Sequence, residues 1–383
     1  MLFCNKSLDY TKKTSTKHKH NLGQFFTPNT LTKYLLSTLP NSRKKVQILE
    51  PSCGSGEFIK EIKNKYKNSI ITGIEIEKDL YQYCNKEYTN IIHTDFLKYN
   101  TNDKFDYIIG NPPYFEMKLN KDLRKDYNDI ISGRLNIYSV FIYKCINILK
   151  QNGILSFVLS SSLLNGRYYQ KLRQFIIKHC DILNIEYVDS KEFIDTKIDL
   201  IIFTIKKTNN SSKYIIRKNN ILLFSPDYIK INNLYKNTIS IHDLNCNVKT
   251  GSITWNKHRE SLSDSDTYRL LIYSHNLKDN KLVIVNHKTK KQYIKTDKYI
   301  QGPCILINRI VGTKKSINIK PVYIKNNMKF LAENHINVIT GPNLDIIYKS
   351  LTDKKLNNTI KLLTGNTQLS KNELLHLIPI KKK

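Results

Sequence analysis

The sequence of 383 residues lacks several features that assign chains to common protein classes. No run of about 18 uninterrupted apolar residues occurs, so no membrane-spanning helix is expected. The polar, basic first 20 residues contain no apolar segment of the kind that directs secretion. The seven cysteines form no C-x-x-C pair and no H-E-x-x-H motif is present, which argues against a zinc site and against a disulfide framework. We therefore expect a cytoplasmic, non-secreted protein without a metal site.

Acidic residues are the scarcer charged class. The sequence holds 32 Asp and Glu against 62 Lys and Arg, a formal net charge of +30. Such a charge favours a polyanionic partner, because Lys and Arg release counterions from phosphates. However, only nine of the basic residues are Arg, and an AT-rich coding sequence would raise the Lys content without selection for binding. The charge is denser in residues 246–383, which hold 25 basic and 9 acidic side chains.

Short runs rich in Ile and Val alternate with helical patterns between about residues 20 and 207. Strands are predicted at 46–49, 70–76, 90–96, 105–110, 153–160, 183–189 and 199–207. Apolar residues at helical spacing predict helices at 31–39, 57–67, 137–150 and 170–180. This alternation predicts an α/β fold with a doubly wound, mostly parallel seven-stranded sheet.

The same patterns divide the chain. Residues 1–20 are expected to form a basic, flexible arm, and residues 21–245 the α/β domain, with a polar linker from residue 208. Residues 246–383 contain short strand-like runs separated by Gly, Pro and Asn, followed by helical patterns. They predict a second, mainly β domain with terminal helices.

A glycine-rich turn, C-G-S-G at 53–56, joins the first predicted strand to a helix. Gly54 and Gly56 permit a tight turn against which a ligand can lie. Glu75 ends the next strand, where a carboxylate can accept both hydroxyls of a ribose. Asp95 and Phe96 end the third predicted strand, where a carboxylate can accept from an adenine amino group and an aromatic ring can stack.

Two features of this region disfavour a dinucleotide. The turn does not follow G-x-G-x-x-G, and three carboxylates, with Glu50 beside Glu75 and Asp95, would repel a phosphate. A ligand with an ammonium group, a ribose and an adenine suits them better. S-adenosyl-L-methionine is such a ligand.

The fourth predicted strand is followed by Asn111, Pro112, Pro113 and Tyr114. These residues fall at the carboxyl edge of the sheet, beside the expected cofactor. The side-chain oxygen of Asn111 and the carbonyl of Pro112 can accept from an exocyclic amino group, which draws its nitrogen toward tetrahedral geometry. Proline holds the loop rigid, and Tyr114 offers a face for a planar base. A stiff turn without chemistry is the alternative reading of N-P-P alone.

The ordered motifs resemble those of amino-methyltransferases that act on DNA. They are GQFFTP (23–28), LEPSCGSGEF (49–58), GIEIEKD (73–79), HTDF (93–96) and GNPPY (110–114). The set is similar to that of the gamma-class adenine-N6 methyltransferases of type II restriction–modification systems. The resemblance covers about residues 20–207, and the C-terminal part resembles their recognition domains more loosely.

The resemblance implies roles for individual residues. Thr27 and the backbone around Cys53 and Gly54 would hold the methionine part of the cofactor, and Glu75 the ribose. Asp95 and Phe96 would hold the adenine. Asn111, Pro112, Pro113 and Tyr114 would be catalytic, and Tyr114 and Phe193 would sandwich the target base. The remaining expected cofactor contacts are Glu50, Ser52 and Ile76.

The resemblance also implies a substrate. It predicts methyl transfer to the N6 of a flipped adenine in double-stranded DNA, by a monomer that binds DNA through residues 246–383. A cognate restriction endonuclease would act separately. Methyltransferases of RNA or of protein glutamine share N-P-P-Y, and a nucleic-acid-binding protein with a degenerate methyltransferase fold is a second alternative. GQFFTP and the C-terminal domain argue against the first, and the intact motif set against the second.

Overall fold

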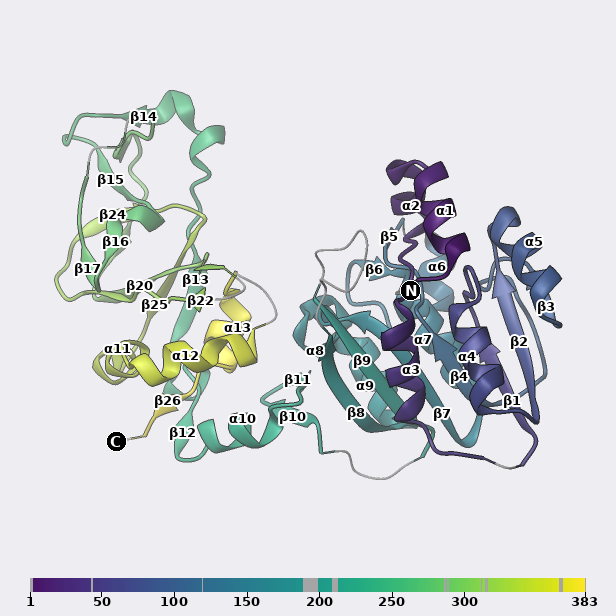
Figure 1. The fold of residues 1–383 in the computed structure, drawn as a ribbon. Helices are drawn as coiled ribbons and strands as arrows, with labels where there is room; N and C mark the ends of the chain where they lie inside the picture. Colours follow the sequence, from purple (N-terminus) through teal and green to yellow (C-terminus); the bar gives the residue numbers. More distant parts are fainter. Residues whose placement is uncertain are drawn as a thin grey trace. The chain divides into compact units, whose positions relative to one another are not determined.

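A computed structural model describes residues 3–42, 44–118, 120–188, 199–208, 213–285, 287, 289–310, 312–313, 316–364 and 368–382. The chain forms two compact units (Figure 1). Unit 1 comprises residues 1–215 and 222–226, and unit 2 comprises residues 216–221 and 227–383. The hairpin of β10 (Ile215–Lys218) and β11 (Ile221–Phe224) lies where the chain passes from one to the other.

Unit 1 is built around a seven-stranded sheet, as predicted. Its order is β3 (Ile91–His93), β2 (Ser69–Glu75), β1 (Val46–Glu50), β4 (Phe105–Gly110), β7 (Leu149–Ser160), β9 (Leu200–Lys206) and β8 (Asp181–Val188). The pairs from β3 to β7 are parallel, and β9 runs antiparallel to both its neighbours. Burial on both faces explains why these strands are continuous apolar runs. The carboxyl ends of β1 to β4 therefore meet at one edge.

The helices of unit 1 make the sheet doubly wound. They are α3 (Asn29–Ser37), α4 (Glu57–Lys65), α5 (Lys78–Glu87), α7 (Ile137–Ile148) and α9 (Gln170–His179), with the shorter α6 (Lys121–Asp126) and α8 (Ser162–Asn165). A small ladder pairs β5 (Glu116–Met117) with β6 (Leu135–Asn136). In α4, Phe58, Ile59 and Ile62 are buried, as their helical spacing predicts. Helix α5 was not predicted, because most of its residues are exposed and polar.

The N-terminal residues differ from the expected flexible arm. They form α1 (Asn5–Lys13) and α2 (Thr16–Leu22). Ser7 is buried, where its hydroxyl lies 2.6 Å from Ser55 Oγ and also donates to Glu57. The Tyr10 ring packs edge-on against Phe26 at 5.8 Å. Ser55 and Glu57 lie far along the sequence from Ser7, so the local basic composition did not reveal these contacts.

Unit 2 is mainly β with helices toward its end, as predicted. One sheet has the order β13 (Asn247–Thr250), β25 (Ile336–Thr340), β20 (Cys304–Asn308), β23 (Val322–Ile324). Another has the order β14 (Leu262–Ser263), β18 (Tyr293–Ile294), β15 (Arg269–Ile272), β24 (Lys329–Ala332), β19 (Ile300–Gln301). Two-stranded ladders join β12 (Thr238–Ile239) to β26 (Ile380–Lys381), β16 (Leu277–Lys278) to β17 (Lys281–Leu282), and β21 (Gly312–Thr313) to β22 (Ser316–Ile317). The helices are α10 (Tyr228–Leu234), α11 (Leu344–Leu351), α12 (Lys354–Leu363) and α13 (Lys371–His376).

Two findings bear on the classes considered from composition. All seven cysteines are free thiols. In the described parts of the chain, no helix has the length and apolar character needed to cross a membrane.

Candidate active site

A pocket of about 320 Å³ lies at the carboxyl edge of the sheet in unit 1. Its wall comes from the segments that follow β1, β2, β3 and β4, together with residues 22–26. Of the predicted site residues, Ser52, Gly54, Glu75, Ile76, Asp95, Phe96, Asn111 and Pro113 line it. The fold therefore brings together side chains from four separate strand ends.

The glycine turn is fixed to the strand beside it. Cys53 donates its N–H to the carbonyl of Ile74 at 2.9 Å, and Gly54 donates its N–H to Glu75 Oε2 at 2.7 Å. Gly54 and Gly56 have φ of 54° and 85°, the left-handed region that glycine adopts without strain. Cys53 is buried and does not line the pocket. The expected contact between its backbone and the cofactor stays a prediction.

Glu75 is held at the end of β2 by two backbone groups. Besides the bond from Gly54, Oε1 accepts from the N–H of Glu77 at 2.8 Å. Burial raises the pKa of Glu75, while these backbone bonds act in the opposite direction. Each carboxylate oxygen has a second lone pair. Glu75 can thus hold the turn and still accept from a ligand.

Asp95 and Phe96 lie together in the turn after β3. Asp95 Oδ1 accepts from the N–H of Leu97 at 2.9 Å, which fixes the carboxylate in the pocket wall. The Phe96 ring is buried and packs at 4.8 Å against Phe141 of α7. Phe141 also lines the pocket.

Asn111 follows β4 with its amide group clamped. Its Nδ2 donates to the carbonyl of Phe25 at 2.8 Å and to Thr27 Oγ1 at 3.1 Å. Its Oδ1 accepts from the Tyr114 hydroxyl, and its backbone oxygen accepts from Ser52 Oγ at 3.3 Å. Since an amide oxygen has two lone pairs, one remains for a ligand. The side-chain amide cannot flip without losing both hydrogen bonds that Nδ2 donates.

Tyr114 and Pro112 are buried outside the cofactor pocket. Tyr114 is 9% exposed, and its hydroxyl lies 2.7 Å from the carbonyl oxygen of Val158. The ring packs against Phe25 at 5.8 Å and against Tyr138 at 6.1 Å. Burial raises the pKa of Tyr114 well above its usual range, so the hydroxyl stays a hydrogen-bond donor at neutral pH.

Three other predicted positions have different surroundings. Thr27 is buried and contacts Asn111 rather than the pocket. Glu50 is buried and is not among the residues that line the pocket. Phe193 lies outside the described residues, so its proposed stacking role stays a prediction.

The segment around GQFFTP supplies site residues that were not assigned individually. Gly23, Gln24, Phe25 and Phe26 line the pocket, as does Phe115 after N-P-P-Y. Gly23 has a φ of 61°, and a Cβ there would lie 2.5 Å from the Tyr114 backbone nitrogen, which donates to the Gly23 carbonyl at 3.2 Å. Gly23 therefore permits the close approach of this segment to the N-P-P-Y loop. The motif was visible in the sequence, but its partner was not.

We expect the buried carboxyl of Glu50 to make the free energy of unfolding depend on pH. Among the described residues Oε2 has no hydrogen-bond partner, and burial raises the pKa of the carboxyl well above its usual range, with smaller contributions from Cys84, Glu57 and Glu75. The folded state thus binds this proton more tightly than the unfolded state does. The stabilising contribution is present below the ordinary glutamate pKa and is lost as pH rises through the folded value.

Replacing Glu50 by glutamine is expected to flatten this dependence. The free energy of unfolding of the unliganded wild type should fall relative to that of Glu50→Gln as pH rises from 4 to 8. Each tenfold decrease in the ionisation constant of Glu50 on folding changes the free energy of unfolding by about 1.4 kcal/mol. Urea denaturation of both proteins across this range measures the difference, and parallel curves would show that the buried carboxyl carries no such linkage.

The pocket fits a cationic cofactor that contains adenosine. None of the described residues that line it is basic, whereas Glu75 and Asp95 make part of its wall acidic. Aromatic and apolar side chains complete the wall, as a purine requires. Among the described residues, no group of His, Cys, Asp and Glu is placed to hold a metal ion. The fold and this site define an S-adenosyl-L-methionine-dependent methyltransferase.

Comparison with known proteins gives the family. Residues 7–193 match the model of the Eco57I restriction-modification methylase family. The modification methylase CviBIII of Paramecium bursaria Chlorella virus NC1A is 32% identical over 97% of both chains. The type II methyltransferase M.CvrRI of Paramecium bursaria Chlorella virus XZ-6E is also 32% identical, again over 97% of both chains. The chain belongs to the type II restriction-modification methyltransferase family.

Solved structures are more distant. A class I S-adenosylmethionine-dependent methyltransferase from Listeria monocytogenes, described as putative, is 19% identical, with a TM-score of 0.44 over 52% of this chain and 65% of the other. A type I restriction-modification methyltransferase subunit from Streptococcus thermophilus is 20% identical, with a TM-score of 0.44 over 56% of this chain and 52% of the other.

Proposed function

We propose that the protein methylates the N6 amino group of an adenine in a short sequence of double-stranded DNA. The observation that carries the proposal is the clamped amide of Asn111 at the edge of the cofactor pocket. Because Nδ2 is held by the Phe25 carbonyl and the Thr27 hydroxyl, Oδ1 is the atom presented to a substrate. A fixed acceptor next to an activated methyl group is suited to an amino substrate.

The chain's own groups would prepare the amino group for reaction. The lone pair of an exocyclic amine is delocalised into the ring, which makes the nitrogen a poor nucleophile. Asn111 Oδ1 and the Pro112 carbonyl oxygen accept hydrogen bonds from its two N–H groups. These bonds draw the nitrogen toward tetrahedral geometry. The two acceptors on Nδ2 polarise the amide and make Oδ1 a better acceptor.

Glu75, Asp95 and Phe96 would hold S-adenosyl-L-methionine, which supplies the methyl group. Glu75 accepts from the ribose hydroxyls, Asp95 from the adenine amino group, and Phe96 packs against the purine. Ser52, Gly54 and Ile76 complete the wall on this side of the pocket. Glu50 is buried, does not line the pocket and makes no proposed contact with the cofactor.

Double-stranded DNA is the proposed substrate, and three features support it. The chain belongs to a family of restriction-modification methyltransferases. It carries a net charge of +30, denser in residues 246–383. It has a second compact unit, which we propose recognises the target sequence. The target base must leave the duplex, at a cost of a few kcal/mol that phosphate contacts would offset. The proposed enzyme acts as a monomer, and a cognate endonuclease would be a separate protein.

Identification of the modified nucleoside tests the proposal. The protein is incubated with methyl-labelled cofactor and a mixture of duplex DNA, RNA and protein extract, and the DNA is hydrolysed for mass spectrometry. We expect label in the N6-methyl-2′-deoxyadenosine released from the DNA. Label in N4-methylcytosine would overturn the choice of base, and label confined to RNA or protein would overturn the choice of substrate.

A further inference from the structure

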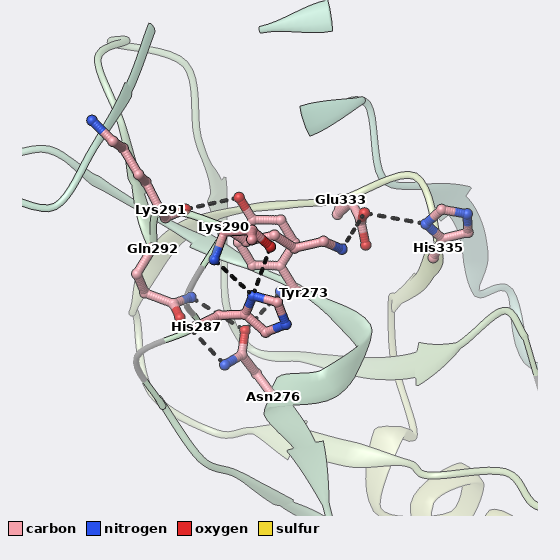
Figure 2. Close-up of polar contacts among 9 residues, drawn as sticks. Tyr273, Asn276, His287, Lys290, Lys291, Gln292, Glu333 and His335 are labelled. Atoms are coloured by element: carbon pink, nitrogen blue, oxygen red, sulfur yellow. Dashed lines mark hydrogen bonds and ion pairs between the residues drawn. The ribbon is translucent and has the colours of Figure 1, made fainter. Parts of the chain in front are cut away.

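A buried carboxylate in unit 2 holds two nitrogen-bearing side chains near one point. The Glu333 side chain is 0% exposed, and its Oε1 lies 3.3 Å from Lys290 Nζ and 3.2 Å from His335 Nδ1. Figure 2 shows Lys290 and His335 approaching Glu333 from opposite sides. Glu333 and His335 lie between β24 and β25, whereas Lys290 comes from the segment between β17 and β18. The tertiary fold alone brings the three together.

Aromatic rings restrict Lys290 further. Its Nζ lies 4.9 Å from the ring centroid of Tyr273 and 5.5 Å from that of Trp255. Tyr273 is itself fixed, because its hydroxyl donates to the Lys291 carbonyl at 2.8 Å (Figure 2). Lys290 nevertheless keeps a side-chain exposure of 21%, and His335 keeps 37%. Both side chains are thus partly exposed, while the freedom of Lys290 to move is reduced.

Stability does not explain this arrangement well. Burying a carboxylate costs free energy that an ion pair rarely exceeds. Among the described residues, Glu333 Oε2 has no hydrogen-bond partner, so part of that cost is not offset. A buried acid that orients partly exposed side chains is instead typical of a site in which direction matters.

The charges of the cluster favour a base edge over a phosphate. The carboxylate of Glu333 neutralises the charge of the Lys290 ammonium and so weakens the attraction of Lys290 for phosphate. The ammonium can still donate hydrogen bonds in fixed directions. A carboxylate next to Nδ1 favours the imidazole tautomer with a proton there, which leaves Nε2 of the neutral ring as an acceptor. A phosphate offers acceptors only. The edge of a base pair in the major groove can offer an acceptor beside a donor.

We propose that Lys290 and His335, positioned by Glu333, read one base pair of the target sequence through its major-groove edge. This inference rests on the proposed function in duplex DNA. Lys290 would donate to an acceptor such as a purine N7 or guanine O6, and His335 Nε2 would accept from an exocyclic amino group of the same pair. Glu333 is a positioning residue that does not touch the DNA.

Sequence preference measured with the full-length protein tests the inference. Sequencing of methylated genomic fragments first gives the preferred site of the wild type. Duplexes randomised at each position of that site are then methylated by wild type, Lys290→Met, Glu333→Gln and His335→Ala. We expect Lys290→Met to lose discrimination at one base pair by roughly 10- to 100-fold. Glu333→Gln and His335→Ala should relax the same position.

Lys291→Met is the matched control. Lys291 is the next residue, its side chain is 53% exposed, and its ammonium lies 3.7 Å from the exposed Asp264. Its replacement should leave the preference at every position unchanged. The salt dependence of binding separates the two kinds of contact, since loss of a phosphate contact reduces the slope of log K against log salt by about 0.9. We expect Lys290→Met to keep the wild-type slope.

Three outcomes would overturn the inference. Lys290→Met with unchanged preference and a shallower salt slope would make Lys290 a phosphate contact. Unchanged preference and slope in all three variants, with a lower melting temperature, would make the cluster a structural ion pair. A wild type that methylates no duplex DNA would remove the proposed function as well, whereas the first two outcomes would leave it standing.

Discussion

Replacing Asn111 by alanine is expected to remove nearly all methyl transfer while the cofactor still binds. The variant loses the acceptor presented to the substrate amino group, and loss of one fixed transition-state partner of this kind costs roughly 100- to 1,000-fold in turnover. The cofactor should be held almost as well as before, because its proposed charged contacts come from Glu75 and Asp95. Single-turnover transfer of labelled methyl groups and calorimetric titration of the cofactor measure the two quantities separately.

Two further variants sharpen the Asn111 experiment. Asn111→Asp keeps an oxygen but cannot donate to the Phe25 carbonyl, so we expect it to remain far below wild-type turnover. Asn68→Ala removes an exposed asparagine elsewhere in unit 1 and should behave as wild type. The proposed mechanism would be wrong if Asn111→Ala turned over at a near-normal rate. A parallel loss of cofactor affinity would instead indicate a general collapse of the pocket.

Replacing Glu75 by alanine is expected to weaken cofactor binding by about 100-fold or more. The change removes a charged acceptor for the ribose hydroxyls, and a hydrogen bond to a charged group contributes about 1.5–3 kcal/mol. It also leaves the N–H groups of Gly54 and Glu77 without their acceptor, so the glycine turn becomes less well held. Titration calorimetry with the cofactor gives the dissociation constant directly.

The Glu75 variant should differ from Asn111→Ala in its kinetics. At saturating cofactor, Glu75→Ala should recover much of its turnover, because its principal defect lies in binding. Glu75→Gln keeps one carbonyl oxygen and should fall between alanine and wild type. Glu87→Ala, an exposed carboxylate of α5, is the control and should bind the cofactor normally. An unchanged dissociation constant for Glu75→Ala would refute the assigned ribose contact.

Motif positions at strand ends were predictable because each motif sits directly after an apolar run. Glu75 is the last residue of β2, and Asp95 and Asn111 come after β3 and β4; the hydrophobic pattern identifies all three strands. Parallel strands bring their carboxyl ends to one edge, so the pattern also predicts that these side chains meet. The pocket confirms that they do.

Contacts between distant segments were not predictable in this way. Thr27 was expected at the cofactor, yet its hydroxyl accepts from Asn111, which is 84 residues away. The GQFFTP segment lies against N-P-P-Y because Gly23 permits the approach of the two backbones. Ser7 reaches Ser55 and Glu57 across about 50 residues and turns an expected arm into packed helices. Composition and local periodicity contain no information on such pairs.

The sequence by itself determined the class of fold, the order of the motifs at the ends of the strands, and the chemical type of each candidate site residue. It could do so because burial imposes a local pattern of apolar residues and because turns, carboxylates and amides have intrinsic preferences. Only the tertiary structure decided that Tyr114 is buried against Asn111 and Val158, that Glu50 lies behind the pocket wall, and that Glu333 joins Lys290 to His335. These arrangements depend on which distant surfaces pack together, and that is fixed by the whole chain rather than by any one segment.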